Sequence, residues 1–188
     1  MMPAHAADAG DADHETQDAE AAPLVIMLCT GNAARSVMAG AMLGLHGAAV
    51  RVTTAGTHVV EHQPMSIRTR DALAAVGLDA SHHRSRQLTD ADVGSADLVV
   101  AMAAEHVRFI RRRHPAGAGH TATIAWLARN LPPGPAPLAD RVAALRLADL
   151  DPDEQGDVAD PAGGTDEDYA ACARQLTVLV GELASRLA

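Results

Sequence analysis

The sequence contains no lysine, and all 15 of its basic residues are arginine. Without a lysine amine the chain cannot form a Walker-type phosphate loop or a Schiff base, so both kinds of chemistry are excluded. Aromatic residues are almost as scarce, with one Trp, one Tyr and one Phe among 188 residues. A site that stacks a ligand ring between two aromatic side chains is therefore hard to build from this chain.

Long hydrophobic runs and a cysteine framework are missing as well. No apolar stretch approaches the roughly 20 residues that a membrane-spanning helix needs, and the first residues lack the basic and then apolar pattern of a signal peptide. Two cysteines, Cys29 and Cys172, are too few for a disulfide framework. We therefore expect a cytoplasmic location and no membrane partner.

Residues 1–22 differ in composition from the rest of the chain. They include six acidic residues, no basic residue and no apolar periodicity, which predicts a disordered acidic tail over 1–22 and one folded domain over 23–188. The tail contributes −6 to the formal net charge of −9, which leaves −3 for the domain. This balance does not suit a nucleic-acid-binding surface, so no nucleic-acid partner is expected.

Short apolar runs alternate with helical patterns along the rest of the chain. Strands are predicted at residues 24–28, 50–54, 98–102 and 120–124, and helices at residues 36–46, 66–76, 105–113, 138–147 and 166–187. Thr165 and Asp168 form a capping pair for the last helix. The alternation predicts an α/β fold, an open, mostly four-stranded parallel sheet with helices on both faces.

A cysteine and an arginine stand at the two ends of a tight loop after the first strand. Cys29 directly follows the apolar run 24–28 and Arg35 precedes a helical pattern, so the loop lies at a helix N-terminus. Unpaired backbone N–H groups and the helix dipole make such a loop suitable for an oxyanion. Arg35 can bind two oxygens of a phosphate-like anion, and the same positive field favours Cys29 as the nucleophilic thiolate. The sequence therefore predicts a phosphate-binding loop.

The spacing within this loop resembles that of a known family. Five residues separate Cys29 from Arg35, Ser36 follows, and Gly31 and Asn32 lie inside. In this pattern the chain resembles the low-molecular-weight protein tyrosine phosphatases, which are related to thiol-dependent arsenate reductases on the same scaffold. Four further segments resemble the family in the same order, so the likeness spans roughly residues 24–188. These segments are residues 53–57, 83–88 and 97–102 and the Asp160-Pro161 pair.

The resemblance implies a phosphomonoester hydrolase of the protein-tyrosine-phosphate type that works through a cysteinyl-phosphate intermediate. It assigns catalytic roles to Cys29 as nucleophile, Arg35 as oxyanion ligand, and Asp160 as the acid and then the base. It requires no metal and no other cofactor. The expected partners are a phosphorylated protein or small phosphate ester, and oxyanions such as phosphate, vanadate or arsenate.

The resemblance also implies binding and supporting roles around these three residues. The rest of the loop is expected to hold the phosphoryl oxygens through Thr30, Gly31, Asn32, Ala33, Ala34 and Ser36. Ser36 is placed to hydrogen-bond the Cys29 sulfur, to cap the helix, or to do both. Asn32 suits a left-handed backbone and is expected to pair with Thr54. His83 is expected to support this network.

The sequence departs from the family pattern in places that bear on substrate choice. Ala34 stands where many relatives carry a second cysteine, so reversible disulfide protection of Cys29 is not expected. Residues 162–163 and 58–60 stand where relatives place the aromatic walls of a slot for the phosphotyrosine ring. Residues 131–157 form a longer segment than the family usually has before its Asp-Pro pair.

Several alternatives remain open from the sequence. The chain could be an arsenate reductase that uses Cys29 with an external thiol, or a non-catalytic oxyanion-binding regulatory protein. Asp151-Pro152 is a second Asp-Pro pair, but Asp160 is preferred because it directly precedes the capped last helix. Cys172 is expected to be a packed core thiol. Residues 111–113 form either a solvated helix end or a docking patch for an acidic substrate.

Overall fold

The computed structural model describes residues 22–188, so the tail predicted for residues 1–22 lies outside it apart from Ala22. One sheet of four parallel strands has the order β2-β1-β3-β4. Its strands are β1 (Leu24–Cys29), β2 (Arg51–Gly56), β3 (Leu98–Ala101) and β4 (Thr121–Thr123). The predicted α/β fold with a parallel sheet is confirmed.

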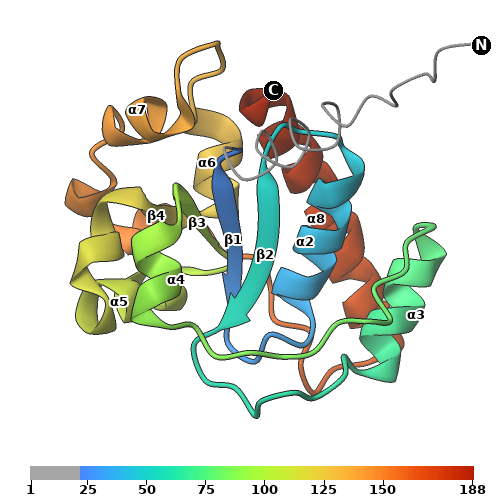
Figure 1. The fold of residues 1–188 in the computed structure, drawn as a ribbon. Helices are drawn as coiled ribbons and strands as arrows, with labels where there is room; N and C mark the ends of the chain where they lie inside the picture. The colour runs from blue at the N-terminus through green and yellow to red at the C-terminus, as the bar shows by residue number, and fades with distance from the viewer. Residues whose placement is uncertain (1–21) are drawn as a thin grey trace, which may run out of the picture.

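Helices cover both faces of this sheet (Figure 1). They are α2 (Arg35–Leu45), α3 (Ile67–Ala75), α4 (Asp90–Ser95), α5 (Ala104–Arg113), α6 (Ile124–Asn130), α7 (Leu138–Ala143) and α8 (Asp166–Leu187), with 3₁₀ turns η1 (Pro115–His120), η2 (Leu147–Asp149) and η3 (Pro152–Glu154). None of the helices within residues 22–188 is both long and apolar enough to cross a membrane.

The side chains of β1 alternate between two apolar layers because successive residues of a strand point to opposite faces. Val25 and Met27 join the cluster that contains α2 and α8, whereas Ile26 and Leu28 join the cluster that contains α4 and α5. In Figure 1, α2 and α8 lie on one side of β1 and β2, and α4 and α5 on the other. Because β1 is buried on both faces, its sequence is a continuous apolar run.

Four elements differ from the sequence prediction, and one of them is α6, since no helix was predicted at residues 124–130. The strand expected at 120–124 ends at Thr123, whose side chain accepts a hydrogen bond from the Trp126 N–H and so starts α6. Helix α4 was not predicted, since its six residues are too few to show a helical period. The helix expected at 138–147 ends at Ala143, and the left-handed backbone of Arg146 (φ 51°) prevents its continuation.

The last helix, α8, begins at the predicted cap. The Thr165 side chain accepts a hydrogen bond from the Asp168 N–H, and the Asp168 carboxylate accepts one from the Thr165 N–H in return. The helix also carries Cys172, which is a free thiol with 3% of its surface exposed. Burial raises the pKa of Cys172 to about 11, so this thiol stays protonated at neutral pH.

The strand order places a crevice at the carboxyl ends of β1 and β3. Strand β2 lies on one side of β1, and β3 and β4 lie on the other side, so the direction in which strands are added reverses at β1. Open parallel sheets bind ligands at this kind of reversal point. The loop after β1 lies here, and residues 157–160 join it because the Val158 N–H donates to the Met102 carbonyl just after β3, at 2.8 Å.

Candidate active site

The loop between β1 and α2 turns its carbonyl groups outward. The N–H groups of Thr57 and His58, just after β2, donate to the carbonyl oxygens of Cys29 and Thr30, each at 3.0 Å. Within residues 22–188, no protein acceptor takes the N–H groups of residues 31–34. These donors are therefore available to an anion in front of α2, where the helix dipole adds positive potential.

Asn32 holds the loop to its surroundings. It is fully buried and has the left-handed backbone that the sequence predicted, with φ 50°. Its amide nitrogen donates to Ser36 Oγ at 3.0 Å and to Thr54 Oγ1 at 2.9 Å. Its amide oxygen accepts from the Arg86 N–H at 3.0 Å, and its carbonyl lies 2.7 Å from His83 Nε2. Every polar group of the side chain therefore has a partner, and the loop is fixed from behind.

Ser36 lies directly beneath the sulfur of Cys29. The two side-chain atoms, Ser36 Oγ and Cys29 Sγ, are 3.0 Å apart and both residues are buried. Because Ser36 Oγ accepts a hydrogen bond from the Asn32 amide, its own O–H is free to point at the sulfur. The Ser36 hydroxyl can therefore donate a hydrogen bond to the sulfur of Cys29.

Arg35 connects the loop to the predicted acid. Its Nη2 donates to Asp160 Oδ2 at 2.5 Å, and its Nη1 donates to the Val158 carbonyl at 3.3 Å. The guanidinium is buried, whereas 45% of the Asp160 side chain is exposed. Asp160 Oδ1 also accepts from the Ala162 N–H at 3.0 Å, which fixes the carboxylate at the mouth of the loop.

The other Asp-Pro pair lies apart from this cluster. The Asp151 side chain accepts a hydrogen bond from the Asp153 N–H and starts the 3₁₀ turn η3. It does not line the cavity that contains Cys29 and Asp160. The structure therefore brings Asp160, and not Asp151, to Arg35.

His106 on α5 is a component of the site that the sequence analysis missed. Its Nε2 lies 3.0 Å from Thr30 Oγ1, which in turn is 3.5 Å from Arg35 Nη2. Burial, together with the nearby Arg35 guanidinium, lowers the pKa of His106 to about 3, so the imidazole is neutral at physiological pH. The only sequence signal was a histidine in the first turn of the helix that follows β3, and the residue is 76 positions from Thr30.

The predicted residues divide into two groups around a small cavity of about 270 Å³. Seven of them line it directly, and Asn32, Ser36, Thr54 and His83 do not. Ser66, Ala162 and Tyr169 complete the wall, so Tyr169 is the one aromatic side chain in it. The seven predicted residues that line the cavity are Cys29, Thr30, Gly31, Ala33, Ala34, Arg35 and Asp160.

One protein-family model and several known proteins are similar to this chain. The family model described as "Low molecular weight phosphotyrosine protein phosphatase" matches residues 24–131. A protein-arginine-phosphatase from Geobacillus stearothermophilus is 31% identical over 166 residues, which are 87% of this chain and 95% of that protein. The "Probable low molecular weight protein-tyrosine-phosphatase EpsP" of Ralstonia solanacearum is 36% identical over 95 residues, which are 50% of this chain and 66% of that protein's length.

A solved structure extends the comparison to the fold. The YwlE arginine phosphatase from Geobacillus stearothermophilus superposes with a TM-score of 0.72 at 30% sequence identity. The superposition covers 88% of this chain and 92% of that chain. The similarity therefore extends beyond the family model's match and includes α8 and the Asp160 segment between residue 131 and the C-terminus.

Proposed function

Because the chain belongs to the low-molecular-weight phosphotyrosine protein phosphatase family, we propose that it hydrolyses a phosphorylated protein side chain through a phosphocysteine at Cys29. As a member of this family, the chain is a cysteine-dependent hydrolase of phosphorylated substrates. The roles of individual residues and the identity of the phosphorylated side chain belong to the proposal.

One observation carries the proposal more than any other. Asp160 lies 125 residues beyond Arg35, yet its carboxylate binds the guanidinium at 2.5 Å and shares one cavity with Cys29. A nucleophile, an oxyanion ligand and a proton donor thus meet at one loop. A binding protein needs the loop and the arginine, whereas an additional carboxylate beside a bound anion serves proton transfer.

In the first step, the Cys29 thiolate attacks phosphorus in line with the leaving group. An S–P bond forms, the bond from phosphorus to the leaving atom breaks, and protonated Asp160 donates its proton to that atom. The N–H groups of residues 31–34 and the Arg35 guanidinium bind the three remaining oxygens. Phosphate oxygens therefore replace Asp160 as the ligand of Arg35, which frees the carboxyl group for the leaving atom.

In the second step, the phosphocysteine is hydrolysed. The Asp160 carboxylate accepts a proton from water, the water oxygen bonds to phosphorus, and the S–P bond breaks. The sulfur leaves as the thiolate that the Ser36 hydroxyl stabilises. Phosphate is released and both side chains return to their starting state.

Phosphotyrosine is the first candidate substrate. The sequence resemblance points to it, and the EpsP relative is described as a tyrosine phosphatase. The cavity offers little to a tyrosine ring, since alanines at 33, 34 and 162 form much of its wall and Tyr169 is its one aromatic residue. We therefore expect a preference for small aryl phosphates over phosphotyrosine peptides.

Phosphoarginine is the second candidate, and a specific observation favours it. The relative that matches 87% of this chain is a protein-arginine-phosphatase, and the match covers 95% of that protein. A guanidinium on a flexible aliphatic stem needs no ring slot, which fits the alanine-rich wall. The exposed part of the Asp160 carboxylate could also accept hydrogen bonds from such a group.

A substrate comparison tests both candidates. Peptides of one sequence carrying phosphotyrosine or phosphoarginine are assayed beside a small aryl and a small alkyl phosphate, in the wild-type protein and in Ala162→Tyr. One added aromatic pair contributes about 0.5–1.5 kcal/mol, so Ala162→Tyr should raise kcat/KM for the phosphotyrosine peptide about 2- to 13-fold. The alkyl phosphate and the phosphoarginine peptide should change less.

The results of this comparison separate the candidates. Faster hydrolysis of the phosphoarginine peptide by the wild-type protein selects the second substrate. Efficient, ring-selective hydrolysis of the phosphotyrosine peptide, unchanged in Ala162→Tyr, would show that other residues form the slot. Thiol-coupled arsenate reduction without hydrolysis of any phosphate would support the arsenate reductase alternative instead.

His106 supplies a further prediction. If it positions Arg35 through the Thr30 hydroxyl, His106→Ala should lower kcat about 10- to 100-fold, because small displacements of a transition-state ligand have effects of this size. His106→Gln can keep a polar group near the Nε2 position and should recover part of the loss. Kinetics are measured below the melting temperature of each variant. Equal losses in both variants, or losses that only follow melting temperature, would contradict a positioning role.

A further inference from the structure

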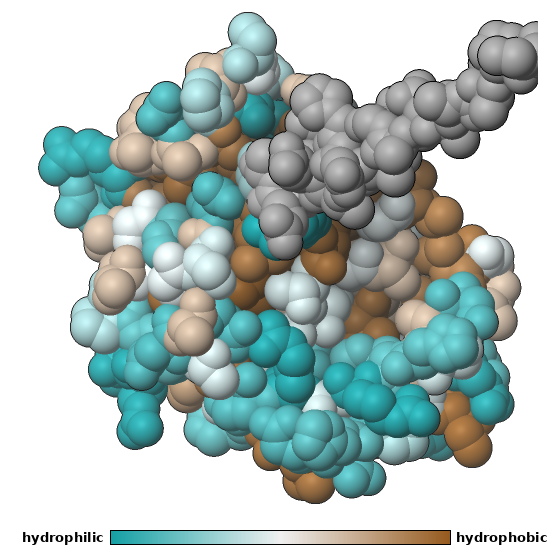
Figure 2. Space-filling view, in the orientation of Figure 1, coloured by the Kyte–Doolittle hydropathy of each residue, from teal (hydrophilic) through white to brown (hydrophobic). Residues whose placement is uncertain are grey.

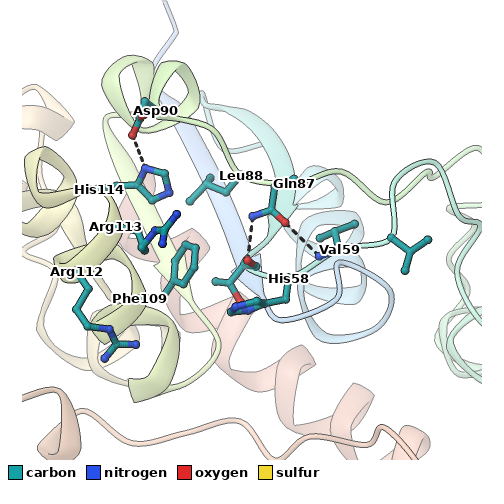
Figure 3. A pocket seen from close by; sticks show the side chains of 11 residues that line it. His58, Val59, Gln87, Leu88, Asp90, Phe109, Arg112, Arg113 and His114 are labelled. Atoms are coloured by element: carbon teal, nitrogen blue, oxygen red, sulfur yellow. Dashed lines mark hydrogen bonds and ion pairs between the residues drawn. The ribbon is translucent and has the colours of Figure 1, made fainter.

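A second hollow, of about 860 Å³, lies beside the phosphate-binding loop (Figure 3). It is an open groove between α5 and the segments that follow β2 and precede α4. Phe109 lies at its centre, with ring centroids 5.4 Å from His58 and 5.6 Å from His114. Arg112 and Arg113 form the α5 side of the groove.

The elements that form the groove contact the phosphate-binding loop. Thr57 and His58 line it, and their N–H groups donate to the carbonyl oxygens of Cys29 and Thr30. On the other side, the Thr30 hydroxyl lies 3.3 Å from the carboxylate of Glu105 in the first turn of α5. The phosphate-binding loop therefore contacts both α5 and the segment after β2, the elements between which the groove lies.

One face of α5 leads from this loop along the groove. Glu105, Phe109, Arg112 and Arg113 are separated by four, seven and eight positions, which places them on one side of a helix. At a rise of about 1.5 Å per residue, the two arginines lie about 10–12 Å along the axis from Glu105. An extended peptide covers that distance in about three to four residues.

The arginine side chains of α5 differ in whether they have hydrogen-bond or ion-pair partners. Arg111 donates to the carbonyl oxygens of Leu147 and Leu150, and Arg108 pairs with Asp153. Arg112 and Arg113, both exposed, have neither a hydrogen bond nor an ion pair from their side chains within residues 22–188.

The acidic residue that lines the groove, Asp90, contacts neither arginine. Its carboxylate lies 2.5 Å from His114 Nδ1. The surface over α4 and α5 is mostly hydrophilic in Figure 2, as expected for a face that stays in water until a charged partner binds. The domain's net charge is negative, so two neighbouring arginines without an ion-pair partner within residues 22–188 are a local exception.

We propose that this groove binds an acidic segment of the phosphorylated protein substrate, three to four residues from the phosphorylated side chain. The inference rests on the proposed phosphatase function and adds a substrate class to it. Arg112 and Arg113 pair with the carboxylates, and the Phe109 ring supports the aliphatic part of the bound segment. Because neither arginine reaches the reacting atoms, the preference acts mainly on KM.

Phosphopeptides of equal length test the groove. Two Glu residues, or two Gln residues as the neutral control, occupy the third and fourth positions on one side of the phosphorylated residue. A second pair of peptides carries them on the other side. The Glu peptide of one pair should have a kcat/KM about 3- to 10-fold higher than its Gln counterpart, the size expected for two exposed ion pairs. The ratio should fall at 0.5 M NaCl because salt screens exposed charges.

Variants assign the preference to the two arginines. Each kcat/KM is divided by the same variant's value for a small aryl phosphate, which does not reach the groove. Arg112→Gln/Arg113→Gln should bring the Glu-to-Gln ratio to about 1, and Arg112→Glu/Arg113→Glu should favour a Lys-flanked peptide. Arg51→Gln/Arg146→Gln removes the same charge from exposed sites that line neither cavity, and it should keep the wild-type ratio.

The possible outcomes are distinct. Equal rates for Glu and Gln peptides on both sides, with normal turnover of the aryl phosphate, overturn the groove proposal and leave the phosphatase proposal intact. A Glu-to-Gln ratio that stays at the wild-type value in Arg112→Gln/Arg113→Gln also overturns the groove proposal, because another surface then binds the acidic residues. Failure to hydrolyse the aryl phosphate, the phosphotyrosine peptides and the phosphoarginine peptides overturns both proposals.

Discussion

Cys29→Ser is expected to abolish phosphate ester hydrolysis while the protein still binds phosphate. The variant removes the nucleophile, because a serine hydroxyl is a much weaker nucleophile than a cysteine thiolate at neutral pH. The groups that bind the anion, the N–H groups of residues 31–34 and the Arg35 guanidinium, are unchanged. Turnover is measured with an aryl phosphate and binding by calorimetric titration with phosphate or vanadate.

Cys172→Ala is the matched control for this variant. It removes the other thiol, which is buried in the core on α8, and should preserve turnover with at most a modest loss of stability. Trapping of a radiolabelled phosphoenzyme in the wild-type protein and in Cys172→Ala, but not in Cys29→Ala, which has no side-chain nucleophile, would locate the covalent intermediate. Turnover near the wild-type level in Cys29→Ser would exclude the covalent mechanism.

Asp160→Ala should slow hydrolysis about 100- to 10,000-fold for esters with basic leaving groups, the range expected for loss of general acid catalysis. Esters with good leaving groups should lose less, because their leaving oxygen needs little protonation. The measurement is a series of aryl phosphates of increasing leaving-group basicity, with single-turnover kinetics to separate the two steps.

Two further variants separate proton transfer from positioning. Asp160→Asn keeps the size of the side chain and one acceptor oxygen, which can bind either Arg35 or the Ala162 N–H, but it cannot donate or accept the catalytic proton. It should therefore lose as much activity as Asp160→Ala. Asp151→Ala changes only the cap of η3 and should stay close to wild type. Retained activity in Asp160→Asn, or a larger loss in Asp151→Ala, would contradict the assignment.

The parts of the site that the sequence could predict are those specified locally. A buried strand, a loop with Cys29 and Arg35 at its ends and a helix after it occupy 22 consecutive residues, so apolar pattern and spacing suffice. Asn32 was predicted to be left-handed because of its side-chain chemistry, and it has φ 50°.

Features that depend on tertiary contacts could not be predicted in this way. His106 reaches Thr30 only because β3 lies beside β1, a pairing that no local pattern specifies. Helix α4 is too short to show a helical period. Thr123 caps α6, but threonine is common in strands, so the sequence alone predicts a strand there. The groove combines α5 with two loops. That the Arg112 side chain has no ion-pair partner within residues 22–188 is visible only in the three-dimensional structure.

The hydrogen bonds of Asn32 decide when the entropy cost of ordering the phosphate-binding loop arises: during folding, and not during anion binding. They order the phosphate-binding loop as the chain folds, so an incoming oxyanion meets a loop whose backbone is already immobile. Affinity for the anion then depends on bonds formed with it and on little else. The same bonds contribute to the free energy of unfolding, and the folded state and the anion complex are therefore stabilised by one set of contacts behind the loop.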